Sequence, residues 1–221
     1  MQAGQTLYDK EGNQVLLFPL DVMNITQWHG AGTYSHQSGC EFDTVGNTAQ
    51  YPVYAPCDCH VLHKYDTYAN GYTRLYTNDV KVRTPSGVKE PGGVVFGFTH
   101  RNSVLEGETF KQGQHIYNTG TSGNVTGDHV HIDQSFTPGA SLVPPATSGQ
   151  SWYINGSVEP VTFWYVNDTD IKNGWGQSWN TYDGGEPGPS PGPTPTPSKY
   201  KGILFLDPRG LSFIPLKEEE Q

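Results

Sequence analysis

Two histidines separated by a single residue, His129 and His131, have the spacing at which two side chains act on one substrate atom. Successive side chains of a β-strand point to opposite faces, so positions two apart share a face. Val130 and Ile132 favour a strand, and the glycine-rich stretch before His129 favours a loop that leads into it. The two imidazoles are therefore expected to project side by side, where one binds a divalent metal ion and the other handles a proton.

Three more residues upstream have side chains suited to the same chemistry. His36 is followed seven residues later by Asp43, and His100 closes the apolar run GGVVFGFTH. Imidazole and carboxylate are both zinc ligands, and three protein ligands plus water form an open catalytic site. His36, Asp43 and one histidine of the later pair would complete such a set. The run before His100 predicts a strand that delivers this side chain to a cleft.

Taken in order, these segments resemble the signature of the lysostaphin-type peptidoglycan metalloendopeptidases. That signature is an early His and Asp, a mid-chain His that ends an aromatic strand, and a late His-x-His. The matching segments are SHQSGCEFD, VVFGFTH and VLEGETFKQGQHIYNTGTSGNVTGDHVHID, within roughly residues 15–136. All five key positions are filled. Two departures are Asp128, directly before His129, and residues 64–92, which read as a longer insertion than most members carry.

The resemblance implies a role for each of the five residues. His36, Asp43 and His131 would be the zinc ligands, with one Zn²⁺ per chain, and His100 and His129 would be the catalytic histidines. It also implies an all-β fold, rich in loops and poor in helix, in which the zinc cleft lies across an antiparallel sheet.

Zinc lowers the pKa of a bound water to about 7, and histidine can take and give a proton near that pH. Together with the resemblance, this set implies an endopeptidase that hydrolyses stem or cross-bridge peptides of bacterial peptidoglycan. The competing interpretation is a catalytically inactive wall-binding or structural tail module that keeps the fold. That alternative predicts a missing ligand, and none of the five positions is missing.

A second dense group of possible ligands occurs in the segment YPVYAPCDCHVLHKYD. Alternation along a strand would put Cys57 and Cys59 on one face and His60 on the other. The two cysteines are therefore predicted to lie in the core and not to bind a second metal with His60 and His63. Three cysteines, an odd number, indicate no disulfide framework and synthesis in a reducing compartment.

Composition limits the remaining possibilities. In 221 residues, 27 glycines, 17 prolines and 13 tyrosines indicate strands and turns, and no stretch shows sustained helical periodicity. The net charge of −9 argues against a nucleic-acid partner, and no apolar run is long enough to span a membrane. The first residues, MQAGQTLYDKEG, do not read as a secretory signal. We therefore expect synthesis in the host cytoplasm and action from a phage tail tip, or alternatively release as a free endolysin.

The sequence predicts four regions. Residues 1–150 would form the zinc endopeptidase domain, and residues 151–186, which hold four of five tryptophans, an aromatic extension packed on it. Within that extension, Trp175 and Trp179 either stack on glycans or, as the simpler interpretation, complete the core. Residues 187–197, PGPSPGPTPTP, would be an extended linker. Residues 198–221 have two apolar runs around a turn and would form a hairpin that docks on other phage tail proteins or on this domain.

Overall fold

The computed structural model describes residues 1–30, 32–104 and 106–184, and the backbone of 202–207 and 210–215. The linker expected at 187–197 lies outside the described residues. The chain divides into two compact units, Met1–Gly188 and Pro189–Gln221. The elements are β1 (Gln14–Val15), β2 (Val22–Gln27), β3 (Phe42–Thr44), β4 (Pro52–Tyr54), β5 (Cys59–Tyr65), η1 (Tyr68–Asn70), β6 (Thr73–Asn78), β7 (Val82–Thr84), β8 (Gly87–Lys89), β9 (Val95–Thr99), β10 (Thr109–Phe110), β11 (His115–Asn118), β12 (Val130–Ser135), β13 (Leu142–Val143), β14 (Tyr153–Ile154), α1 (Pro160–Phe163), β15 (Asp170–Asn173), β16 (Gly202–Asp207) and β17 (Gly210–Pro215).

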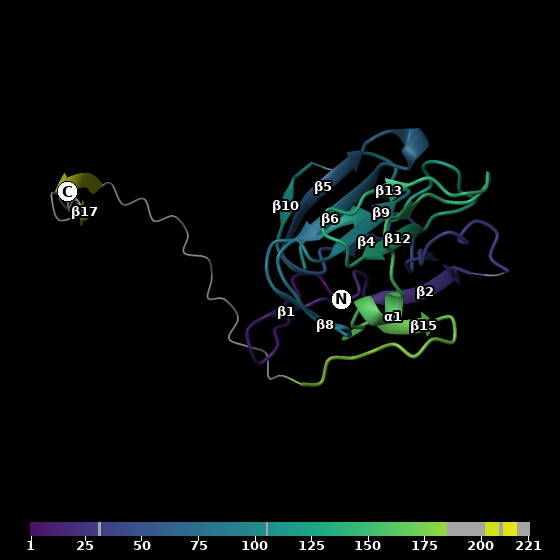
Figure 1. The fold of residues 1–221 in the computed structure, drawn as a ribbon, viewed down its shortest axis with the longest axis horizontal. Helices are drawn as coiled ribbons and strands as arrows, with labels where there is room; N and C mark the ends of the chain where they lie inside the picture. Colours follow the sequence, from purple (N-terminus) through teal and green to yellow (C-terminus); the bar gives the residue numbers. More distant parts are fainter. Residues whose placement is uncertain (31, 105, 185–201, 208–209, 216–221) are drawn as a thin grey trace. The chain divides into compact units, whose positions relative to one another are not determined.

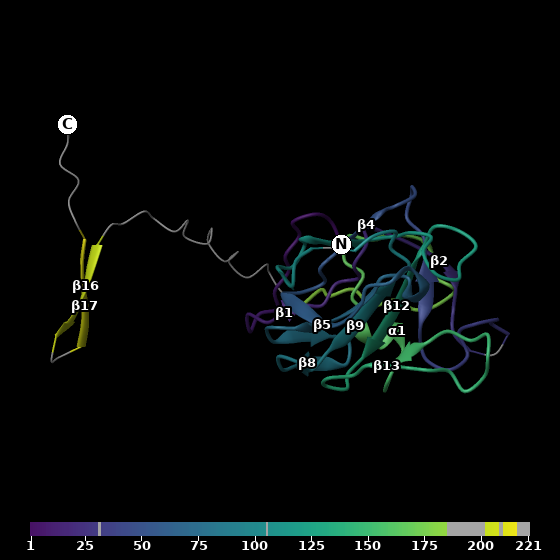
Figure 2. The same ribbon diagram turned by 90° about the horizontal axis from the view of Figure 1, so that it is seen from above.

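The main sheet of the first unit has eight strands in the order β10-β5-β6-β9-β12-β3-β2-β15. Its central strands run side by side across the domain (Figure 1), and Figure 2 shows the same arrangement from above. The predicted all-β, loop-rich fold is confirmed. Most pairings are antiparallel, but β15 runs parallel to β2, and β1 runs parallel to β7 in a smaller sheet. A parallel pair requires a long crossover connection, which local sequence patterns do not reveal.

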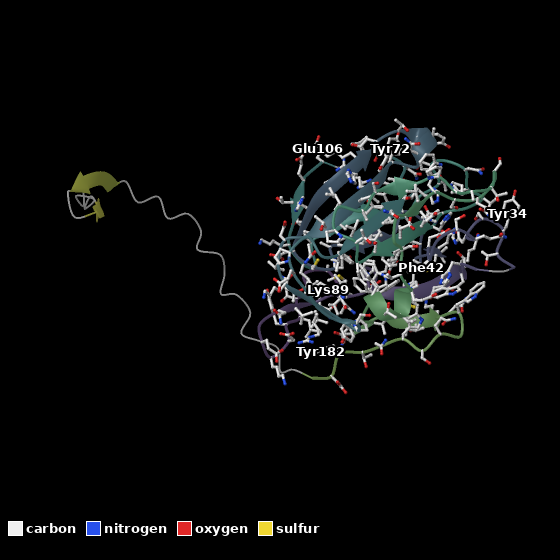
Figure 3. The ribbon with its side chains drawn as sticks, in the orientation of Figure 1. Tyr34, Phe42, Tyr72, Lys89, Glu106 and Tyr182 are labelled. Atoms are coloured by element: carbon white, nitrogen blue, oxygen red, sulfur yellow. The ribbon has the colours of Figure 1, made fainter. Side chains whose placement is uncertain are left out.

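The hydrophobic core lies on one face of this sheet. Alternate residues of β9 and β12, among them Phe96, Phe98 and Ile132, are fully buried there. Phe42 of β3 lies inside the domain (Figure 3), where its ring stacks against Phe18. On the opposite face of β3 and β12 the side chains are polar, and the candidate site lies on this face.

The stretch 64–92, expected as an insertion, is partly integral to the sheet. It supplies β6, which lies between β5 and β9, and the β7–β8 hairpin. Cys57 and Cys59 are fully buried in the core and free, whereas the exposed His60 pairs with Asp79. The cysteines therefore lie where the strand alternation predicted.

Residues 151–184 contribute α1, β14 and β15 to the same compact unit. Trp164 is fully buried, and Trp179 packs edge-on against Phe18 and Trp28. Trp179 is partly buried and packs against the core, as the simpler interpretation expected. Trp175 is 43% exposed.

The second unit is described through β16 and β17, which pair as an antiparallel hairpin from Gly202↔Pro215 to Asp207↔Gly210. In the part of the chain that the structure describes, no helix has the length and apolar character needed to cross a membrane.

Candidate active site

The register between β3 and β12 brings the first two candidate metal ligands together. Asp43 lies directly opposite His131 in the antiparallel pair, and side chains at such positions are near neighbours. The Nδ1 atom of His131 lies 3.0 Å from Oδ1 of Asp43. Both side chains are buried, at 4% and 7% exposure. Pairing of strands far apart in sequence therefore builds the first half of the site.

His36 adds the third candidate ligand from the loop between β2 and β3. Its Nε2 atom lies 3.5 Å from Oδ1 of Asp43, and its ring meets that of His131 edge-on at 4.8 Å. A main-chain hydrogen bond of 2.7 Å from Gly30 N to His36 O closes this part of the loop. The structure thus gathers His36, Asp43 and His131 into one buried group whose ligand atoms all lie within 4.8 Å of one another.

The geometry of this group fits a zinc ion. Zinc bonds of about 2.0–2.2 Å to nitrogen and oxygen place tetrahedral ligand atoms about 3.3 Å apart. The separations from Asp43 Oδ1, 3.5 Å to His36 and 3.0 Å to His131, lie on either side of that value. One carboxylate and two imidazoles would leave a fourth position for a water molecule, as catalytic zinc sites do.

The ionisation of the three side chains has clear physical causes. Burial and, after it, the neighbouring His131 lower the pKa of His36 to about 3. Burial opposes the charged form of Asp43, but the hydrogen bond from His131 and the surrounding imidazoles lower the pKa of the carboxyl to about 2. His131 lies between Asp43 and Asp133, and these carboxylates raise its pKa despite burial.

His129 and His100 lie beside this group. His129 precedes β12 on the same face as His131, and its Nε2 atom lies 3.5 Å from Oδ2 of Asp43. His100 follows β9, the other neighbour of β12, and its ring centroid lies 4.6 Å from that of His129. All five residues singled out in the sequence are therefore close together.

Backbone carbonyls fix the tautomers of these two histidines. Nδ1 of His100 donates to the carbonyl of Ser122, and Nδ1 of His129 donates to that of Gly127, both at 2.9 Å. A carbonyl only accepts, so each Nδ1 carries a proton, and a neutral ring with this tautomer has its lone pair on Nε2. Burial and the neighbouring His131 and His129 lower the pKa of His100 to about 3, which keeps this ring neutral.

His100 adopts an unusual backbone conformation, with φ of 87°. Positive φ is rare outside glycine and is often found at functional sites. Two glycines accommodate the turn: a Cβ at Gly71 would lie 3.0 Å from His100 N, and one at Gly120 would lie 2.2 Å from His100 O. Gly120 also exchanges both main-chain hydrogen bonds with His129, so it lies between the two histidines.

The five residues line a cleft of about 680 Å³. Two aromatic side chains that the sequence interpretation did not single out, Tyr34 and Trp152, also line it and are 83% and 56% exposed. Tyr34 lies at the outer edge of the domain (Figure 3). The loops that carry them are joined by the main-chain bond from Ser151 N to Ser35 O. No local pattern distinguishes these aromatics from those of the core, because only the folded loops expose them.

Asp133 is a further residue that the sequence interpretation missed. Its Oδ2 atom lies 3.2 Å from Nε2 of His131, on the side of the ring away from Asp43. Such a carboxylate fixes the orientation of a metal-binding histidine. The signal was present, because Asp133 lies two residues after His131 and shares its strand face.

The remaining histidines and Asp128 lie apart from this group. Asp128 accepts hydrogen bonds from Thr119 Oγ1 and from Gln50 N, so it braces loops beside the cleft. His115 is exposed in β11, and His29 pairs with Glu159 outside the residues that line the cleft.

No family model matches the sequence. The chain is 30% identical over 178 residues to Morphogenesis protein 1 of Bacillus phage B103. This match covers 78% of the chain and 46% of the phage protein, so the chain spans less than half the length of that relative.

Three solved structures are also similar to the chain. LytU matches at a TM-score of 0.38 and 18% identity, over 63% of this chain and 82% of that one. A zinc containing peptidase from Vibrio cholerae matches at a TM-score of 0.36 and 20% identity, over 57% of this chain and 39% of that one. The catalytic domain of the antimicrobial peptidase lysostaphin from Staphylococcus simulans matches at a TM-score of 0.34 and 16% identity, over 71% of this chain and 88% of that one. The chain resembles lysostaphin-type peptidases. Because these TM-scores are low, the roles proposed below rest on the geometry of the site.

Proposed function

We propose that the chain is a zinc-dependent endopeptidase of the lysostaphin type that hydrolyses peptide bonds of bacterial peptidoglycan. The observation that carries the proposal is the convergence of His36, Asp43 and His131 at zinc-ligand separations, with His100 and His129 beside them. The first three would hold one zinc ion and the last two would be the catalytic histidines.

Zinc bound by these ligands supplies a Lewis acid and a water of lowered pKa. Asp133 holds the His131 ring so that Nδ1 faces the metal position and Nε2–H points away from it. The Nε2 lone pairs of His100 and His129 are available in the cleft, since both Nδ1 atoms are committed to carbonyls. Either of these imidazoles can accept the proton of the attacking water at Nε2, and the same imidazolium can then pass that proton to the leaving amine.

The cleft is suited to an extended peptide. It is open to solvent, and two exposed aromatic side chains, Tyr34 and Trp152, belong to its lining. The stem and cross-bridge peptides of peptidoglycan are extended and solvent-exposed substrates of this kind. We include both in the proposed substrate class.

The phage relative supports a role in the virion. It is a phage protein with the name Morphogenesis protein 1, and the match covers 78% of this chain. We therefore favour a virion-associated lysin at the tail tip over a free endolysin. In this proposal, residues 1–150 and 151–186 form the catalytic domain with its aromatic extension, 187–197 are the linker, and 198–221 dock on another tail protein.

Metal content and wall digestion test the proposed function together. We expect the purified chain to bind zinc at the cleft and to release peptides with new amino termini from purified Gram-positive cell walls, as identified by mass spectrometry. The variants His36→Ala, Asp43→Ala and His131→Ala should each lose this zinc and all activity. His115→Ala, an exposed histidine outside the cleft, is the matched control and should keep both.

The competing function is a wall-binding or structural module without activity. A chain that binds walls and folds stably but releases no peptide with zinc supplied would contradict the endopeptidase and favour that module. Retention of full activity in any one of the three ligand variants would remove that residue from the metal set.

A further inference from the structure

A second group of metal-ligating side chains lies outside the cleft. His29 follows β2, Cys40 precedes β3, and Glu159 precedes α1. One nitrogen, one sulfur and one oxygen from these residues lie within 4.8 Å of one another. None of the three lines the cleft, so the catalytic proposal leaves them unexplained.

The separations within this group are close to those of a tetrahedral zinc site. His29 Nε2 lies 3.0 Å from Oε2 of Glu159, and Cys40 Sγ lies 4.0 Å from Oε1 of the same carboxylate. Zinc bonds of about 2.3 Å to sulfur and about 2.0–2.2 Å to nitrogen and oxygen place such atoms about 3.3–3.6 Å apart. Shifts of a few tenths of an ångström in these ligand atoms would therefore bring the two separations to the values that a bound zinc ion requires.

The three side chains are partly shielded from solvent, but solvent still reaches them. The His29 side chain is 13% exposed, Cys40 is half-buried, and the Glu159 side chain is 52% exposed. An ion can therefore enter from solvent, and water can complete the coordination. Burial and the nearby carboxylate of Glu159 raise the pKa of the Cys40 thiol to about 11. A divalent cation would replace that thiol proton and neutralise the adjacent carboxylate.

The position of the group suggests what an ion would do. His29 and Cys40 are the two ends of the loop that carries His36, and Glu159 begins the turn into α1. A cation held by all three would close the base of this loop and fasten it to the segment around α1. The loop would then hold His36 more rigidly beside Asp43.

We propose that His29, Cys40 and Glu159 bind a second divalent cation of the zinc class, which fastens the loop that carries His36 to the start of α1. This site is structural and independent of the catalytic one. Unlike the catalytic site, it contains a thiolate ligand.

Cobalt substitution tests this proposal, because only a cobalt–thiolate bond gives an intense near-ultraviolet charge-transfer band. The metal-free chain saturated with Co²⁺ should show this band and bind two equivalents of metal. Cys40→Ser should lose the band and one equivalent, and Glu159→Gln should weaken the band. His36→Ala should keep the band while losing the other equivalent, and Cys57→Ala, which removes a buried cysteine elsewhere, should leave the band unchanged.

Absence of the band in the wild-type chain at saturating cobalt would overturn the proposal, as would a band that survives in Cys40→Ser. Circular dichroism melting of Cys40→Ser, with and without zinc, gives a second measurement. We expect zinc to raise the melting temperature less in this variant than in the wild-type chain, and an equal rise in both would also overturn the proposal. A chain that shows the band but fails to cut cell walls would refute only the catalytic proposal.

Discussion

Gly120 lies between the two proposed catalytic histidines, and its missing side chain leaves room for the carbonyl of His100. The variant Gly120→Ala adds a Cβ that would lie 2.2 Å from His100 O and 2.9 Å from Asn102 Oδ1. Real Cβ atoms essentially never come within 3.0 Å of such an atom, so the gap to His100 must open by at least 0.8 Å. The backbone of Gly120 does not have positive φ, so alanine adds this steric conflict without a dihedral penalty.

A catalytic group displaced by about 1 Å loses about 10²-fold in rate. We therefore expect Gly120→Ala to lower the turnover of wall or peptide hydrolysis by about 10²-fold. Zinc content should be unchanged, because none of the added contacts involves His36, Asp43 or His131. The assay is the rate of release of new amino groups, with zinc content measured by mass spectrometry of the purified variant.

Gly127→Ala is the matched control from the same region. A Cβ at Gly127 would meet nothing within 4 Å, and the residue does not have positive φ. This variant should keep wild-type turnover. Wild-type turnover in Gly120→Ala, with the fold intact by circular dichroism, would refute the idea that the position of His100 limits the reaction.

Four further outcomes are expected. His129→Ala should retain zinc and lose about 10²–10⁴-fold in turnover, and loss of zinc from this variant would exchange the roles assigned within the His-x-His pair. Asp133→Ala should weaken zinc binding by about 10–100-fold in competition with a chelator, since His131 loses its orienting carboxylate, and unchanged affinity would contradict that role. Phe42→Ala should lower the free energy of unfolding in urea by about 3–5 kcal/mol, because this fully buried ring packs against three other aromatic side chains; a loss below about 1 kcal/mol would be inconsistent with that packing. A chain ending at Gly185 should keep its melting temperature and its hydrolysis of soluble peptides, whereas unfolding would mean that the tail completes the core.

The parts of the site that follow from local periodicity were predictable from the sequence. The spacing of His129 and His131 determines a shared strand face, and the alternation at Cys57 and Cys59 places both in the core. Asp133 follows from the same rule, because it lies two residues after His131 on the same strand face.

The parts that depend on long-range pairing were not predictable in this way. The antiparallel register that sets Asp43 opposite His131 depends on how two distant strands align, and a shift of one residue would turn Asp43 to the other face. The parallel pairing of β15 with β2 and the packing of Trp179 against the core likewise depend on segments distant in sequence. The residue types alone suggested His36 and Asp43 with one histidine of the later pair, and the resemblance to a known family selected His131 as that histidine.

The adjacency of β3 and β12 also has a consequence for the order in which the chain is made. Asp43 and His131 are 88 positions apart, yet their strands are neighbours in the sheet. At about 5–20 residues per second, a ribosome needs about 4–18 s to synthesise the chain between them. During that interval β3 has an unpaired edge on the side that β12 later covers, and such edges promote association between chains. The nascent protein is therefore most prone to aggregate before residue 135 has emerged.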